Sequence, residues 1–327
     1  MALALMAIVW TALTFYAVLG GADFGAGMLH LLARGRTAEK QRAAIAATIG
    51  PVWEANHVWL IFAITGLFSA FPRAFEALGT LAFAPATLAL IAIVVRGAAF
   101  AFAAQADGEP KARAAFERLF GAASVAAPFL FGTIAGGLAR EHGGGQPGFW
   151  IGPFQLTIGA LAVAICAALA ASFLAVESRR SGDPQLGATF RTRALWAVAA
   201  VGALALVALA LAPVEAPRLF HGLTHRALPE LVIALAGVTG ALAALARRQY
   251  GAARAAMALS VVAVMWGWGF AQYPHIVGTT ATVGNTAASS PELTALVVAL
   301  AGGLVLLLPS LWLLYVAFRR QPLEVQK

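Results

Sequence analysis

The stretch that decides the fold of this 327-residue chain is Ala194–Ala212, which reads ALWAVAAVGALALVALALA. None of its residues carries a charge. A helix needs about 20 mostly apolar residues to cross the hydrocarbon core of a bilayer. Arg191 and Arg193 stand just before the stretch, as basic residues do at the cytoplasmic end of a span. We therefore predict a membrane-spanning helix at this position.

The composition extends this prediction to the whole chain. Hydrophobic residues make up 61% of it and charged residues 11%, whereas ordinary soluble domains have about 25% charged residues. A soluble core cannot hide this much apolar surface from water, but a bilayer can. Long apolar runs also lack the short alternating strands of a membrane barrel. We predict an all-α integral membrane protein with a single transmembrane domain, residues 1–327, and nine spans. The spans are expected at about 3–22, 51–71, 77–104, 119–139, 152–175, 194–212, 229–247, 253–273 and 293–318.

Lys and Arg are divided unequally between the two sides of these spans. Of the 22, only Arg73, Arg140, Arg218 and Arg226 fall in the loops after the even-numbered spans, and 17 fall in the other loops or the C-terminal tail. Cytoplasmic loops carry the excess of basic residues, so we predict an outside N-terminus and a cytoplasmic C-terminus.

Basic residues scattered over short loops also argue against nucleic-acid binding as the reason for the net charge of +8. The first segment lacks a basic n-region, so we expect it to be a span and not a cleaved signal.

Ionisable residues inside spans are functional candidates, because a charge in hydrocarbon costs several kcal/mol. We expect Asp23 at the cytoplasmic end of span 1, Glu54 one turn inside span 2, and Arg96 in the cytoplasmic part of span 3. Arg96 would favour the ionised carboxylates and burial would disfavour them. Two interpretations stay open: acids that pass protons inward from the cytoplasm, or ion pairs that fix helix register. The glycines around Asp23 favour a helix end, and Arg96 is expected to be structural or to snorkel.

The histidines and the cysteine give weaker signals. His57 lies three residues after Glu54 on the same helix face. It could ligate haem iron, but no second axial ligand stands out at matching depth, so a hydrogen bond to Glu54 or to a neighbouring helix is the better interpretation. His221 and His225 form an i, i+4 pair without an adjacent carboxylate motif, and the single Cys166 provides no Cys-based metal site. We expect this chain to bind no metal and no cofactor by itself.

Two motifs carry a family resemblance. Residues 21–29 read GADFGAGML and residues 51–60 read PVWEANHVWL. The first is similar to an Asp-Gly-Phe-Asp-x-Gly-x-Gly-Met-Leu segment, and the second to a Pro-x-Trp-Asp/Glu-x-Asn-x-Val-Trp-Leu signature. Both belong to subunit II of cytochrome bd-type ubiquinol oxidases, including the cyanide-insensitive branch. The resemblance extends over the whole chain, but the outer loops here are compact and residues 21–24 read Gly-Ala-Asp-Phe where Gly-Phe-Asp is expected.

The resemblance implies a nine-helix subunit of the bacterial inner membrane that pairs with a larger subunit I and is not catalytic alone. The complex would oxidise quinol and reduce dioxygen to water with protons from the cytoplasm. Haem b and haem d, or haem b only, would belong to subunit I. Glu54 would take up protons and Asp23 would belong to the same pathway. The residues implied at the subunit contact or its channels are Trp53, Asn56, His57, Trp59 and Arg96. Lipid, quinone and a small single-helix accessory subunit are the other implied partners.

Two alternatives compete with this interpretation. A stand-alone secondary transporter would be expected to have broken helices and a site at the membrane midplane. The expected depth of Asp23 and Glu54, near one face, counts against it. A self-contained b-type cytochrome would need the pair of axial ligands that the sequence does not offer.

Overall fold

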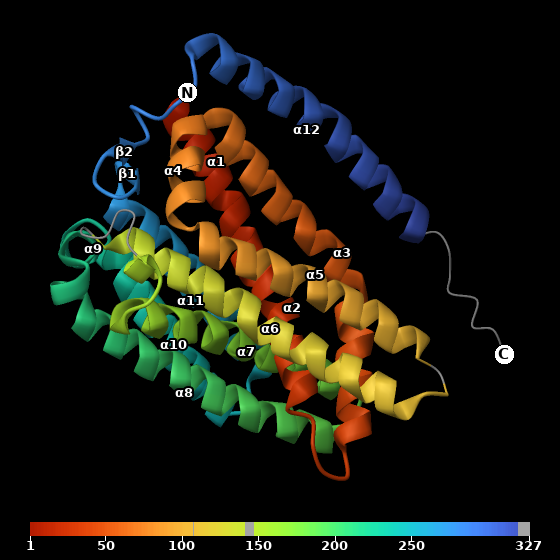
Figure 1. Cartoon of the computed structure of the whole chain (residues 1–327). Coiled ribbons are helices and arrows are strands. Elements are labelled where there is room, and N and C mark those ends of the chain that lie inside the picture. The colour runs from red at the N-terminus through yellow and green to blue at the C-terminus, as the bar shows by residue number, and fades with distance from the viewer. Residues whose placement is uncertain (107, 141–146, 320–327) are drawn as a thin grey trace.

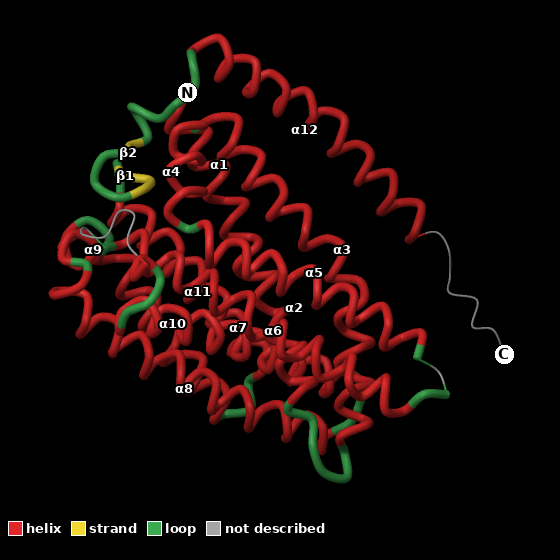
Figure 2. The backbone as a smooth tube through the Cα atoms, viewed as in Figure 1, coloured by secondary structure: helices red, strands yellow, loops and turns green. Residues whose placement is uncertain are grey.

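The computed structural model describes residues 1–106, 108–140 and 147–319, without the side chains of 48–55, 147, 304, 307, 308, 311 and 314–319. Helices make up almost all of this part of the chain (Figure 2). They are α1 (Ala2–Phe15), the π-helical turn η1 (Tyr16–Gly20), α2 (Gly21–Leu31), α3 (Ala38–Ala70), α4 (Pro72–Leu81), α5 (Phe83–Gln105), α6 (Pro110–Ala139), the 3₁₀ turn η2 (Pro147–Phe149), α7 (Pro153–Arg180), α8 (Pro184–Glu215), α9 (Pro217–His225), α10 (Leu228–Ala246), α11 (Tyr250–Gln272) and α12 (Ser290–Arg319). Two short antiparallel strands, β1 (His275–Val277) and β2 (Ala281–Thr282), lie between α11 and α12 (Figure 1).

Seven helical segments of the described chain are long and apolar enough to cross a membrane. They are Ala2–Leu31 (α1, η1 and α2 as one), α5, α6, α7, α8, α10 and α11. The helix pair Asn56–Ala70 and Pro72–Leu81, bent by 116°, counts as an eighth if it is one span. Each predicted range falls on helical segments of the described chain, and the helical membrane architecture is confirmed. The number of nine spans and the orientation of the termini stay predictions.

The helices differ from the predicted span ranges at several points. The first span continues through Asp23 to Leu31, so the expected end at residue 22 does not exist. The range 77–104 is divided at Ala82 between α4 and α5. The helices α6 and α8 begin at Pro110 and Pro184, about nine and ten residues before their apolar stretches. Proline is favoured in the first helical turn, where its missing N–H costs nothing.

The bend between α3 and α4 follows from the Phe71-Pro72 sequence. A residue before proline is driven out of the helical conformation, and Phe71 has φ −137° and ψ 59°. Phe71 is buried together with Ala70 and Ala74 at this corner. The backbone N–H of Ala288 donates to the carbonyl of Ala70 over 2.9 Å, which fastens the chain before α12 to the same corner.

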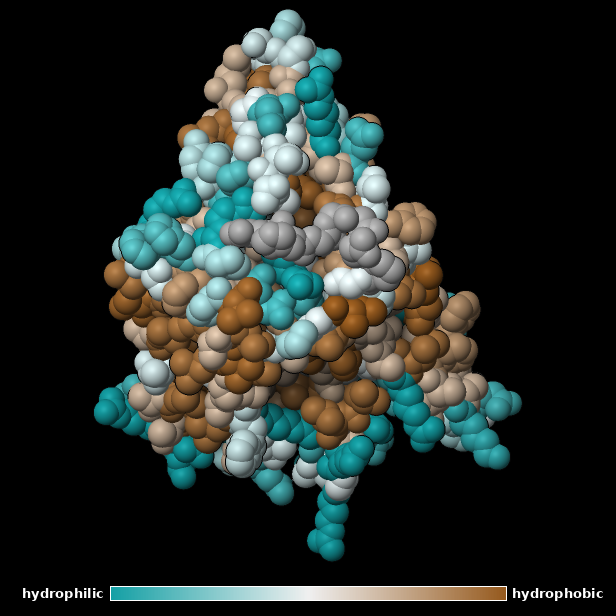
Figure 3. All heavy atoms as spheres, turned by 60° about the vertical axis from the view of Figure 1, so that its left-hand side comes forward, coloured by the Kyte–Doolittle hydropathy of each residue, from teal (hydrophilic) through white to brown (hydrophobic). Residues whose placement is uncertain are grey.

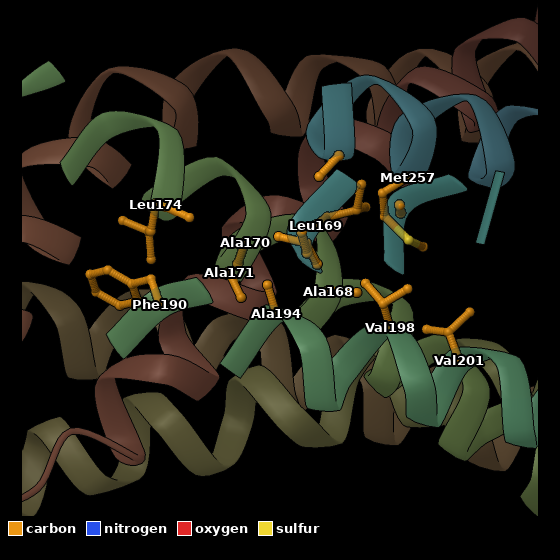
Figure 4. Close-up of a cluster of buried hydrophobic side chains, with 14 of the residues drawn as sticks. Ala168, Leu169, Ala170, Ala171, Leu174, Phe190, Ala194, Val198, Val201 and Met257 are labelled. Carbon is orange, nitrogen blue, oxygen red and sulfur yellow. The ribbon is translucent and has the colours of Figure 1, made fainter. Parts of the chain in front are cut away.

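The helix α7 forms the centre of the bundle, where small side chains let neighbouring backbones approach. Its residues Ala168, Ala171 and Ala175 are fully buried. Figure 4 shows side chains of α7 and α8 that point toward one another, with Leu174 beside Phe190. Close packing of small residues is the main source of helix association in lipid, where the hydrophobic effect between helices is absent.

Large apolar side chains are exposed across the middle of the molecule. In Figure 3 they form a hydrophobic band, with hydrophilic residues gathered at the lower end. On α3 this exposed set includes Val58, Ile61 and Phe68, which are spaced to share one helix face. The helix α12 lies along the outside of the bundle beside α3 (Figure 1), and its Val298, with other large side chains, is exposed. A surface of this kind must be covered by lipid or by another membrane protein.

Candidate functional site

The buried ion pair between Arg96 and Asp23 is the centre of the candidate site. The Nη2 atom of Arg96 on α5 donates to Oδ1 of Asp23 on α2 over 2.7 Å, and also reaches the backbone carbonyl of Asp23 over 3.3 Å. The exposed fractions of the two residues are 1% and 2%. A charged pair this deep in an apolar bundle requires close geometry and further hydrogen bonds to offset desolvation.

Ser124 on α6 completes the polar cluster around Arg96. The Nε atom of Arg96 donates to the Ser124 hydroxyl over 2.9 Å, and that hydroxyl donates to the carbonyl of Phe120 over 2.7 Å. The guanidinium carbon also lies 4.9 Å from the ring centroids of both Phe24 and Phe120, close enough for cation–π attraction. Three helices are therefore joined by one guanidinium group.

Glycine spacing on α2 brings these helices together. A Cβ at Gly27 would lie 2.7 Å from the Ser124 Cβ, and a Cβ at Gly25 would overlap the carbonyl oxygen of Cys166 on α7. The segment Gly20–Gly27 therefore serves close helix contact, and not the helix end that was expected near Asp23. Asp23 lies eight residues before the end of α2, or roughly 12 Å at 1.5 Å per residue.

The structure brings together two of the three ionisable residues that were predicted inside spans. Asp23 and Arg96 are in contact, and Arg96 is enclosed by protein, which rules out the snorkelling expectation. Glu54 and Trp53 lie in α3 where the side chains are outside the described residues, so their place in the network stays a prediction. The expected contact between His57 and Glu54 stays a prediction for the same reason.

The other predicted contact residues on α3 are Asn56, His57 and Trp59, and Asn56 and Trp59 lie against the first span. Asn56 is 1% exposed, and its amide lies against Gly20. The indole of Trp59 stacks on Phe15 with ring centroids 4.6 Å apart. His57, the next residue after Asn56, is partly buried. These positions place the 51–60 motif against the helix that carries Asp23.

Sequence reasoning missed Ser124 and Tyr16. The sequence did offer a signal for Ser124, because an arginine in a span needs polar partners and Ser124 is a hydroxyl within the predicted fourth span. Tyr16 has a buried hydroxyl at the start of the π-helical turn η1. Nothing in the spacing of apolar residues marks that turn.

Two arginines bind backbone carbonyls at the end of α11 and in the turn between β1 and β2. Arg226 donates to the carbonyl of Tyr273 at the end of α11 over 2.7 Å, and Arg218 donates to the carbonyl of Gly278 over 3.2 Å. His275 stands beside them, where burial, with a smaller effect of the Arg218 charge, lowers the pKa of its imidazole.

The rings of His221 and His225 stack with their centroids 4.0 Å apart. Within the described residues, no three His, Cys, Asp or Glu side chains gather as a metal site.

Comparison with known proteins places the chain in a family. Residues 1–318 match the family model described as cytochrome bd terminal oxidase subunit II. The chain belongs to that family. Its architecture is similar to a chain in the structure of bd oxidase from Geobacillus thermodenitrificans, with a TM-score of 0.78 over 97% of this chain and 98% of that chain. At 24% identity that likeness shows the fold.

Curated relatives agree over shorter stretches. The chain is 36% identical over 89 residues to cytochrome bd ubiquinol oxidase subunit 2 of Bacillus subtilis, which is 27% of this chain and 26% of the relative. It is 29% identical over 207 residues to cytochrome bd-I ubiquinol oxidase subunit 2 of Escherichia coli, which is 60% of this chain and 52% of the relative. The matches thus span about a quarter to a half of these relatives. Family membership confirms the resemblance of the two motifs and a multi-span protein of the bacterial inner membrane.

Proposed function

We propose that this chain is the second subunit of a respiratory quinol oxidase, where it supports a larger haem-bearing subunit I and takes up protons from the cytoplasm. The complex would oxidise quinol and reduce dioxygen to water, with haem b and haem d, or haem b only, held by subunit I. Family membership supports this assignment over a stand-alone transporter. The single observation that carries the proton role is the buried Asp23–Arg96–Ser124 cluster.

The bonding of Asp23 in this cluster leaves one carboxylate oxygen available for proton transfer. Arg96 is bonded to Oδ1 of Asp23, and Oδ2 has no partner among the described residues. An acid held in this way can exchange a proton at its free oxygen while its bonded oxygen stays fixed. We assign proton uptake to Glu54 and onward transfer to Asp23, because the motif that carries Glu54 packs against the helix of Asp23 through Asn56 and Gly20.

The exposed apolar face of α3 supports a partner in the membrane. Val58, Ile61 and Phe68 are exposed on one side of α3, and Asn56 is buried on the opposite side. We assign this face, together with α12, to the contact with subunit I. Lipid, quinone and a small accessory subunit would occupy other parts of the apolar surface.

Purification of the tagged chain from its native membranes tests the assignment directly. We expect a larger companion subunit, identified by mass, and b- and d-type or b-type haem bands in a reduced-minus-oxidised spectrum. A colourless chain that purifies alone in detergent that preserves other respiratory complexes would contradict the assignment and favour the transporter.

The change Glu54→Gln tests proton uptake. We expect oxygen reduction by the assembled complex to slow by about tenfold or more, within the range of a lost acid–base group, while the haem spectrum is unchanged. Turnover is measured as quinol-dependent oxygen consumption per haem. Glu76→Gln, at an exposed carboxyl of α4, is the matched control and should leave the rate unchanged. Full turnover of a correctly assembled Glu54→Gln complex would eliminate the role.

A further inference from the structure

Four buried polar atoms around the π-helical turn η1 lack a partner among the described residues. They are the Tyr16 hydroxyl, Oδ2 of Asp23, and both Nδ2 and Oδ1 of Asn56. Tyr16 is 9% exposed, Asp23 2% and Asn56 1%. More than nine in ten buried polar groups in proteins have a hydrogen-bond partner, either protein or ordered water. Three such side chains at or next to one turn therefore call for partners other than the described side chains.

Tyr16 and Asn56 lie at the two ends of η1, and Asp23 follows the turn by three residues. A Cβ at Gly20 would lie 2.7 Å from Nδ2 of Asn56, so the amide lies against the last residue of η1. Tyr16 is the first residue of η1, and its ring is edge-on to Phe24 with centroids 6.4 Å apart. Phe24 directly follows Asp23 and lies against the Arg96 guanidinium. A single π turn in a helix often marks a functional site.

The donors and acceptors fit water. The set offers a hydroxyl and an amide N–H₂ that can donate, and a carboxylate oxygen and an amide oxygen that accept. A buried water typically makes about three hydrogen bonds to such groups. An apolar ligand would leave all four atoms unsatisfied, and a cation would be repelled by Arg96, which already holds Asp23.

We propose that Tyr16, Asn56 and Asp23 hold one or more ordered water molecules at the π turn. These waters continue the route of proton transfer beyond Oδ2 of Asp23. This role of the waters rests on the proposed function. In the transfer, the Asp23 carboxylate first takes up a proton at Oδ2 from the cytoplasmic side. The carboxyl then gives a proton to a bound water as that water donates another of its protons onward, so that each group returns to its starting state. Tyr16 and Asn56 are positioning residues in this scheme.

The change Tyr16→Phe gives a test whose sign depends on the water. If the hydroxyl is buried without any partner, its removal relieves a desolvation cost and raises the melting temperature of the complex. If the hydroxyl holds water, its removal breaks hydrogen bonds and lowers the melting temperature. We expect the lower value for Tyr16→Phe and no change for the matched Tyr250→Phe, at the start of α11. A raised melting temperature for Tyr16→Phe would overturn the water site.

Two further readouts separate the site from its function. In the intact complex we expect a reduced-minus-oxidised infrared O–H band that shifts in H₂¹⁸O and is lost in Tyr16→Phe and in Asn56→Leu. If that band persists in both variants, the water site is overturned. In both variants turnover should fall by about threefold to tenfold, as for a lost hydrogen bond. The ratio of the rate in H₂O to the rate in D₂O should be larger than in the unchanged complex. If the infrared band is lost but the turnover rate and the H₂O/D₂O rate ratio are unchanged, the water site stands and only proton transfer through it is overturned. Full turnover in Glu54→Gln would remove the proposed uptake route and leave the water site standing.

Discussion

Replacing Arg96 by leucine is expected to lower the free energy of unfolding of the subunit by about 3–5 kcal/mol, the usual effect of leaving one member of a buried ion pair without its partner. Asp23 would remain in an apolar bundle with its Oδ1 unbonded, and Ser124 would lose its donor. The measurement is the yield of haem-containing complex from membranes and its melting temperature. Both should fall strongly.

The double change Asp23→Asn with Arg96→Leu is the informative control. It removes the buried charge entirely, so most of the lost stability should return. Turnover of this complex then distinguishes the two interpretations that the sequence left open. Slow oxygen reduction with normal haem content would assign Asp23 to the proton path, whereas a normal rate would make the pair purely structural. If Arg96→Leu alone assembled as well as the unchanged chain, the ion pair would not contribute to stability as its geometry implies.

The comparison of prediction with structure separates two kinds of signal. Apolar runs predicted which segments are helical, because hydropathy reports the part of each helix that meets lipid. They could not give the starts of α6 and α8, whose first turns carry polar residues that hydropathy does not mark as helical. The predicted end of the second span at residue 71 coincides with the corner at Phe71, which the Phe71-Pro72 pair explains.

The candidate site shows the same division. Asp23 and Arg96 were recognised because charges are rare in spans, and the structure confirms that they meet. Their surroundings were misjudged because glycine was interpreted by its behaviour in water, as a breaker of helices. In a membrane bundle glycine marks close backbone contact, which at Gly25 and Gly27 positions α7 and Ser124. Ser124 and Tyr16 depend on contacts between helices far apart in sequence, and no local pattern reports those.

Replacing Gly25 by alanine is expected to destabilise the subunit by about 3 kcal/mol or more, at or above the upper end for overpacking. The added Cβ would overlap the carbonyl oxygen of Cys166 and lie 2.8 Å from the Cβ of Ala170, so α2 and α7 would have to move apart. Backbone atoms of α7 cannot turn aside as a flexible side chain can. The melting temperature and haem content of the purified complex measure the effect.

The matched control is Gly251→Ala, near the start of α11, where an added Cβ meets no atom within 4 Å. Alanine there should stabilise the helix by roughly 0.5–1 kcal/mol through its better helix propensity. The same intrinsic gain applies at Gly25, so a loss at that position must come from the contact with α7. Because Asp23 lies on the same helix α2, separation of α2 from α7 should also slow oxygen reduction in any complex that still assembles. If Gly25→Ala were as stable and as active as Gly251→Ala, the close approach of α2 to α7 would be wrong, and the position of Asp23 with it.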